Sequence, residues 1–168
     1  KEKEYDFAVP FNDRASLENV ITVISVCFYL NIDSNLISGG LRKLLPVPMR
    51  MEIKAGINNC QLIEDYYNSD PGSLKMATDF LKGQGGKKTT LILSDFIQAG
   101  RKDEDLYGEV AELVRKTGIS RFIGIGPSLS AMARLFRAED KFYMSTDDFI
   151  KNLITGDFNN EIILIKGS

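Results

Sequence analysis

The sequence predicts an α/β domain with a doubly wound, mostly parallel sheet, preceded by a short helical segment. From residue 49 onwards strand-like and helix-like runs alternate, which is the pattern of a parallel sheet with helices on both faces. The helix-like runs carry apolar residues three to four positions apart, as one buried helix face requires. Only the first two strand-like runs are joined by a tight turn, so we expect an antiparallel pair at one sheet edge.

The first 48 residues predict a separate segment. We expect a short strand at 5–9, a helix from Asp13 to about Leu30, and a second helix at 35–44 that Asp33-Ser34 caps. Leu45-Pro46-Val47-Pro48 follows, and two prolines at this spacing favour an extended link over a helix. The sequence therefore predicts a domain boundary between residues 48 and 49.

The elements after the boundary follow from apolar runs and their punctuation. Asp70-Pro71 is a good helix start, because Asp caps free N–H groups and proline lacks the N–H that would be unpaired there. The glycine-rich segment from Gly83 to Gly86 ends the expected helix before the next strand. The expected strands are 50–54, 60–65, 89–93, 121–125, 141–144 and 161–165, and the expected helices are 71–82, 103–117, 127–136 and 146–154.

The composition and charge of the chain exclude several classes of function. The chain has 168 residues, 43% of them hydrophobic, and a net charge of −2, so it lacks the basic field of a nucleic-acid binder. Its longest apolar stretch, Val20–Leu30, is too short to span a bilayer. Two cysteines suit reduced thiols in a cytoplasmic protein. The chain has no histidine, which excludes Ser-His-Asp and Cys-His catalysis within it, and we expect no metal ligands.

The stretch from Arg50 to Ser73 predicts a binding site. An apolar strand ends there at Glu64-Asp65, just before the capped helix, and α/β proteins hold ligands at this edge of the sheet. A helix N-terminus beside the loop would suit an anion such as phosphate. Asp65 can accept hydrogen bonds from ribose hydroxyls or simply cap a turn, and Arg50 can meet a phosphate or be an ordinary edge-strand arginine.

Further candidate residues lie at other strand ends. Tyr66 and Tyr67 point to opposite sides if extended, so at most one faces a site, and Tyr67 is the candidate. Asp95 follows the strand at 89–93 as a weaker candidate for a polar substrate. Lys166-Gly167-Ser168 is either a cationic substrate contact or a solvated strand exit.

Neither of two phosphate-binding loops is present in full. Gly124-Ile125-Gly126-Pro127-Ser128 matches half of a dinucleotide loop, but Leu129 stands at the third glycine, and a tight strand-to-helix turn explains the glycines equally well. The sequence contains no G-x-x-x-x-G-K-[ST] loop, so this chain does not cradle a triphosphate in that manner.

These residues resemble a known family. Arg50-Met51-Glu52 and the run Ile63 to Ser73 are similar to the Mur ligase signature GR-x-E … DD-x-YNANP-x-S, in the form found in the ligases that add D-alanyl-D-alanine. The sequence departs from that pattern at Met49, Glu64, Ser69 and Asp70. Ile165-Lys166-Gly167-Ser168 resembles the family's V-KGS strand exit. Asp13 to Asn19 stands where the family has G-x-HN-V-x-N, of which only Asn19 is retained.

The resemblance implies an ATP-dependent, ADP-forming amide ligase of peptidoglycan precursor synthesis, acting through an acyl phosphate. Its substrates would be UDP-N-acetylmuramoyl-tripeptide and D-Ala-D-Ala. Residues 49–168 would be the Rossmann-like C-terminal domain and 1–48 the helical tail of the central ATPase domain. ATP and magnesium would be held mainly by the rest of that central domain. The chain would then be inactive alone, and its partners would be its own N-terminal and central domains. Its sequence is most similar to the subgroup of these ligases that is fused to an alanine racemase.

The resemblance also assigns residues. Arg50 would be catalytic at the γ-phosphate, with Asp65 at the ribose, Asn19 at the adenine, and Asn68 a further nucleotide contact. The substrate contacts would be Tyr67, Asp95, Lys166 and Ser168.

Two other function classes stay open. The chain could be a stand-alone nucleotide- or phosphosugar-binding module without chemistry. It could also be a receiver-like domain that is phosphorylated on Asp95, with Glu64 and Asp65 as the neighbouring acids.

Overall fold

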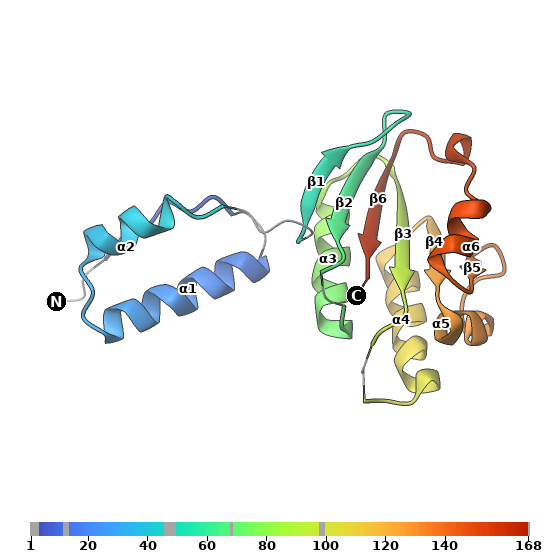
Figure 1. Ribbon diagram of the computed structural model, residues 1–168, viewed down its shortest axis with the longest axis horizontal. Coiled ribbons are helices and arrows are strands. Elements are labelled where there is room, and N and C mark those ends of the chain that lie inside the picture. The colour runs from blue at the N-terminus through green and yellow to red at the C-terminus, as the bar shows by residue number, and fades with distance from the viewer. Residues whose placement is uncertain (1–3, 12–13, 46–49, 68, 98–99, 168) are drawn as a thin grey trace. The chain divides into compact units, whose positions relative to one another are not determined.

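A computed structural model of the chain describes residues 4–11, 14–45, 50–67, 69–97 and 100–167. The chain divides into two compact units, Lys1–Pro48 and Met49–Ser168 (Figure 1). Of the helices that the structure describes, none combines the length and the apolar character needed to cross a membrane.

The first unit consists of helices α1 (Arg14–Tyr29) and α2 (Ser34–Leu41). Asp33 caps α2 through its side chain, as expected. The predicted strand at 5–9 is wrong, because these residues take no regular secondary structure. Tyr5 and Phe7 instead pack their rings on Phe28 of α1, with centroid separations of 4.8 and 6.1 Å.

The second unit is built on a six-stranded sheet with strand order β1-β2-β6-β3-β4-β5. Only β1 is antiparallel to its neighbour, β2, and the remaining pairs are parallel. The predicted mostly parallel sheet with an antiparallel edge pair is therefore confirmed. The strands are β1 (Glu52–Ala55), β2 (Gln61–Asp65), β3 (Lys88–Ser94), β4 (Arg121–Ile125), β5 (Lys141–Tyr143) and β6 (Glu161–Lys166).

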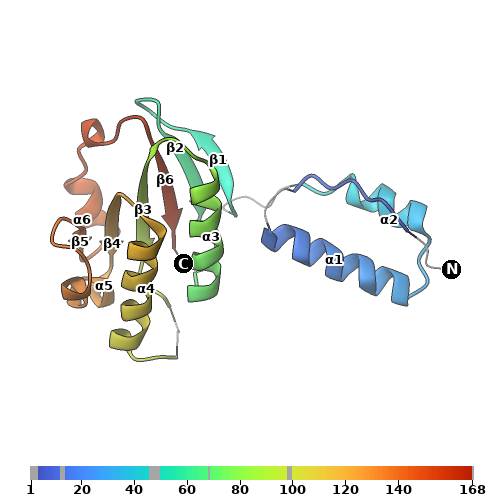
Figure 2. The ribbon, with the colours of Figure 1, turned by 180° about the vertical axis from the view of Figure 1, so that it is seen from behind.

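Helices cover both faces of this sheet. The long helices α3 (Pro71–Gly83) and α4 (Asp103–Thr117) lie side by side on one face, toward the viewer in Figure 2. The opposite face carries the short helix α6 (Thr146–Lys151). The remaining helical turns are α5 (Pro127–Ala131), η1 (Ala133–Leu135) and η2 (Thr155–Asp157).

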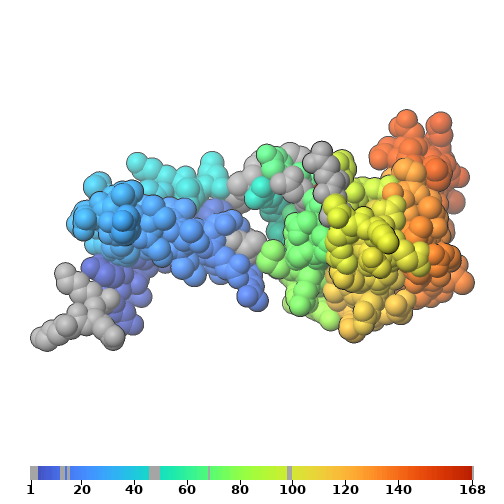
Figure 3. Space-filling model, turned by 90° about the horizontal axis from the view of Figure 1, so that it is seen from below, coloured from blue at the N-terminus to red at the C-terminus, as the bar shows by residue number. Residues whose placement is uncertain are grey.

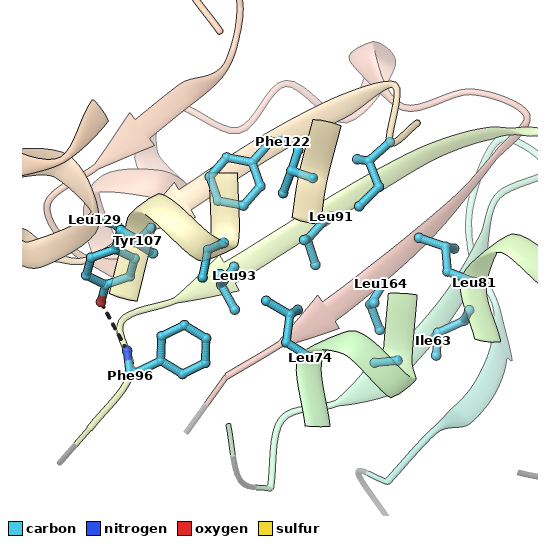
Figure 4. Packing of buried hydrophobic residues seen from close by; sticks show 14 of the residues in the cluster. Ile63, Leu74, Leu81, Leu91, Leu93, Phe96, Tyr107, Phe122, Leu129 and Leu164 are labelled. Carbon is cyan, nitrogen blue, oxygen red and sulfur yellow. Dashed lines mark hydrogen bonds between the residues drawn. The ribbon is translucent and has the colours of Figure 1, made fainter. Parts of the chain in front are cut away.

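Successive side chains along each strand point to opposite faces of the sheet. They therefore form two hydrophobic cores, one on each face. Leu91, Leu93 and Leu164 point to the face of α3 and α4 and are fully buried there (Figure 4). Ile92 and Ile163, one position away, belong to the smaller core of the opposite face. Because strand side chains have a period of two, this alternation fixes which polar residue at each strand end faces which side.

Three expected helices end early, and the helix expected at 35–44 ends at Leu41. The run predicted at 127–136 splits after Ala131, because Met132 leaves the helical conformation and the chain tightens into η1. The helix predicted at 146–154 ends at Lys151. There the side-chain amide of Asn152 donates to the Asp148 carbonyl at 2.8 Å, the kind of side-chain bond that competes with a continuing helix.

Candidate functional site

The carboxyl ends of the parallel strands bring polar residues to one edge of the second unit. Asp65 of β2 lies in register with Lys166 of β6, and Leu93, next to the strand end of β3, pairs with Lys166 on its other side. We call the residues Asp65, Asp70, Asp95 and Lys166 the polar edge. Figure 3 views the molecule from the side at which these strands end.

Asp65 and Lys166 form an ion pair. Lys166 Nζ lies 3.0 Å from Asp65 Oδ2, and the two side chains are 1% and 13% exposed. The predicted role of Lys166 as a cation presented to substrate does not fit this geometry, because the ammonium is buried against a carboxylate of its own chain.

Asp70 caps α3 in a reciprocal arrangement with Ser73. The Ser73 N–H donates to Asp70 Oδ1 at 2.9 Å, and the Asp70 N–H donates to Ser73 Oγ at 3.1 Å. Burial alone would raise the pKa of Asp70, but hydrogen bonds from Ser73 and Gly72, and the positive charge of Lys166, outweigh it and lower that pKa. The expected anion site at this helix N-terminus is therefore already filled by the carboxylate of Asp70.

Arg50, which precedes β1, and Tyr67, which follows β2, contact each other. The Arg50 guanidinium carbon lies 4.8 Å from the centre of the Tyr67 ring, within the range of a cation–π contact. Both side chains are exposed, so the stacked guanidinium stays accessible to an anion. Met51, next to Arg50, has a φ of 50°, in the left-handed region.

Tyr66 has a different partner from Tyr67. Its hydroxyl donates to Glu64 Oε2 at 3.1 Å, and Lys54 Nζ lies 2.7 Å from the same oxygen. The hydrogen bond to Glu64, with some desolvation, raises the pKa of Tyr66. Glu64 and Tyr66 thus belong to a surface network of the β1–β2 hairpin.

Asp95 is occupied by the protein itself. Its two oxygens accept hydrogen bonds from the Ser128 N–H at 2.9 Å and the Leu129 N–H at 2.8 Å, and Tyr107 donates to Oδ1 at 3.1 Å. Asp95 therefore caps the start of α5 from a neighbouring strand. These contacts argue against Asp95 as a substrate contact or a phosphorylation site, and they explain the dinucleotide-like glycines as a strand-to-helix turn.

Gly167 and Ser69, which lie in the stretches that resemble the family signature, have unusual surroundings. A Cβ on Gly167 would lie 2.9 Å from Ser94 Oγ, so the exit of β6 passes tightly over the end of β3. Ser69, where the family pattern has alanine, has a buried hydroxyl without a hydrogen-bond partner in the part of the chain that the structure describes. Such a group is unusual in folded proteins and points to a missing partner.

Asn19, the candidate residue of the first unit, lies exposed on α1. Asn68 and Ser168 lie outside the described residues. Among the candidate residues that the structure describes, it brings Arg50 together with Tyr67 and Asp65 together with Lys166.

The described residues offer no metal-binding cluster. Among them, no group of three or more Asp, Glu or Cys side chains is placed to hold an ion. The residues present thus do not fit a magnesium site, and we derive no catalytic step through one. A groove of about 280 Å³ between α3 and α4 is lined by other residues, among them Pro71, Lys75, Glu109 and Leu113.

Known proteins share both the sequence and the fold. UDP-N-acetylmuramoyl-tripeptide–D-alanyl-D-alanine ligase of Rickettsia prowazekii is 26% identical over 168 residues, and the match covers 99% of this chain and 37% of that ligase. The ligase of the same name from Escherichia coli is 24% identical and matches 97% of this chain and 36% of its own length. This chain thus spans little more than a third of these relatives.

Solved structures agree on the fold. MurF from Acinetobacter baumannii superposes with a TM-score of 0.73 at 20% identity, covering 96% of this chain and 36% of that protein. MurF from Thermotoga maritima, solved in complex with ADP, superposes with a TM-score of 0.69 at 17% identity, over 94% of this chain and 36% of its own. The family model described as Mur ligase, glutamate ligase domain, matches residues 49–168, the whole of the second unit. This chain belongs to the Mur ligase family.

Proposed function

We propose that this chain is the carboxy-terminal part of an ATP-dependent, ADP-forming ligase that adds D-Ala-D-Ala to UDP-N-acetylmuramoyl-tripeptide. The observation that carries the proposal is a match to ligases of that name over 99% of the chain, so both units share the resemblance. In the proposed reaction the tripeptide carboxylate takes the γ-phosphoryl group of ATP. The amine of D-Ala-D-Ala then attacks the acyl phosphate, and inorganic phosphate leaves.

The proposal assigns residues 1–48 to the end of a central ATPase domain and residues 49–168 to the C-terminal domain. Helix α1 supports the first assignment, because it exposes apolar side chains along one face. Val23 and Val26 are 54% and 52% exposed, and Asn19 shares their helical face. Exposed apolar faces of this kind normally pack against further protein, here the remainder of the proposed domain.

Arg50 has the clearest role in the proposed chemistry. Phosphoryl transfer depends mainly on positioning and on stabilising charge, and a guanidinium supplies both through paired hydrogen bonds. Arg50 is exposed, lies at the start of the second unit and rests on the ring of Tyr67. We therefore assign Arg50 to the γ-phosphate and Tyr67 to holding its guanidinium.

Asp65 is the proposed ribose contact. Acids at the ends of parallel strands accept hydrogen bonds from ribose hydroxyls in many nucleotide sites. Asp65 is 13% exposed at such an end, and Lys166 is the only partner of its carboxylate recorded among the described residues. Asn19 remains the proposed adenine contact on the first unit.

The test is a product assay on the full-length protein that contains this chain. We expect ATP, UDP-N-acetylmuramoyl-tripeptide and D-Ala-D-Ala to give ADP, phosphate and the pentapeptide product in equal amounts, measured by mass spectrometry and phosphate release. L-Ala-L-Ala serves as the control acceptor and is expected to give no product. The proposal would be ruled out if phosphate were released at the same rate with and without D-Ala-D-Ala and no new amide product were formed.

A further inference from the structure

Asp65 is held by the protein through one of its two carboxylate oxygens. Oδ2 lies 3.0 Å from Lys166 Nζ. Within the described ranges 4–11, 14–45, 50–67, 69–97 and 100–167, Lys166 is the only residue recorded as a partner of this carboxylate. The Asp65 side chain is 13% exposed and so keeps some access to a ligand. The polar edge thus presents a carboxylate that one lysine holds and that is partly exposed.

Lys166 has an environment that fixes its ammonium group. Its side chain is 1% exposed, and it lies directly beside Asp65 because β6 and β2 are paired in register at these two residues. Its charge also reaches Asp70, whose pKa it helps to lower. A buried ammonium must stay paired, because leaving it without its carboxylates would cost several kcal/mol. The position of Asp65 Oδ2 is therefore set by the β6 strand.

We propose that Lys166 is a positioning residue for nucleotide recognition, which holds Asp65 by Oδ2 so that Oδ1 accepts a hydrogen bond from a ribose hydroxyl. This inference rests on the proposed function, in which Asp65 meets the ribose of ATP. Without the lysine, the carboxylate is free to rotate about its side-chain bonds and loses its fixed direction. A site built to pair a hydroxyl discriminates strongly against a ligand that lacks it, and this discrimination depends on that direction.

The experiment measures discrimination between ribose and deoxyribose, because a merely structural lysine would not affect it. The dissociation constants of ADP, 2′-deoxy-ADP and 3′-deoxy-ADP are measured by calorimetry on the full-length protein and its variants. The wild type is expected to prefer ADP to one deoxy form by about tenfold, the size of one well-made hydrogen bond. Asp65→Asn and Lys166→Met are each expected to reduce this preference to about twofold or less.

Two further variants sharpen the result. The double variant Asp65→Asn/Lys166→Met is expected to show no greater loss than either single variant, because both act on the same hydrogen bond. Lys75→Met, a change at an exposed lysine of α3, is the matched control and is expected to keep the wild-type preference. If Lys166→Met does not fold, Lys166→Gln replaces it, with an expected loss of preference of about threefold or more, because the amide lacks the charge that holds the carboxylate.

Each outcome decides a different claim. A folded Lys166→Met or Lys166→Gln protein with the full wild-type preference would overturn the inference and leave Lys166 a purely structural residue. An Asp65→Asn protein with the full preference would remove Asp65 from the ribose as well, and the inference with it. Neither result touches the product assay with D-Ala-D-Ala, so failure of this inference and failure of the proposed function are seen separately.

Discussion

Gly126 shows how a single residue fixes one side of the polar edge. It has a φ of 130°, and a Cβ there would lie 2.4 Å from the Asp95 carboxylate carbon. Only a residue without a side chain lets Asp95 reach across to the Ser128 and Leu129 N–H groups. The glycines around residue 125 are thus explained by this cap and by the close packing of Phe142 on Gly124.

Replacing Gly126 by alanine is expected to destabilise the protein. The change Gly126→Ala adds a clash with Asp95 and a strained backbone, which together cost about 2–4 kcal/mol. Gly108→Ala is the matched control, because that position lies in α4, has no atom within 4 Å of an added Cβ, and gains about 0.5–1 kcal/mol from helix propensity. Urea unfolding measures both free energies, and a Gly126→Ala protein as stable as wild type would contradict the assigned role of Asp95.

At the scale of single residues, the sequence predicts which residues lie near a site better than it predicts which residues they contact. Arg50, Asp65 and Tyr67 are found from a strand end and a signature, and the structure brings Arg50 and Tyr67 into contact. The burial of Lys166 could not be predicted, because it depends on the pairing of β6 with β2, two strands far apart in the sequence. The same holds for Asp95, whose partners lie on α5.

Among the elements, α3 has the strongest local signals in the chain. The sequence predicts its Asp70 cap and the proline at its first position, and the structure adds the reciprocal bond from Ser73. Periodicity likewise predicted the six strands. It failed at residues 5–9, where three apolar residues alternate as in a strand but pack on α1 and meet no strand partner.

The cap of α3 makes a pH-dependent contribution to stability. Because the folded pKa of Asp70 is lowered, its stabilising effect is present above the unfolded pKa of about 4 and is lost as the pH falls through the folded pKa. Asp70→Asn keeps a capping oxygen but does not titrate. We therefore expect the wild type to be more stable than Asp70→Asn at pH 7, and this advantage to disappear below the folded pKa.

Urea unfolding from pH 7 down to about pH 2.5 checks this expectation, because the series starts above the unfolded pKa of Asp70 and runs below it, towards the lowered folded pKa. Asp70→Ala, which removes the cap, is expected to cost about 0.5–2 kcal/mol at pH 7 and less once Asp70 is protonated. A difference between wild type and Asp70→Asn that stays constant across the whole range would contradict the assignment of the charged cap.

On the scale of the whole molecule, the two units differ in the size of their cores and in their match to the family model. The second unit has its own core and matches the Mur ligase family over its full extent. The first unit has a small core, Val20, Ile37 and Leu41, and leaves much of α1 exposed. The assignment of the first unit to a central ATPase domain and the fusion of the ligase to an alanine racemase remain predictions.

Arg50 provides the most direct test of the central claim, that the second unit supplies a charged group to phosphoryl transfer. In the full-length protein, Arg50→Ala is expected to lower kcat by about a hundredfold or more, with the KM for the tripeptide substrate changed little. Arg101→Ala, which removes an exposed arginine paired with Glu109, is the control and is expected to leave kcat unchanged. An Arg50→Ala enzyme that releases phosphate at the wild-type rate, dependent on D-Ala-D-Ala, would contradict the account.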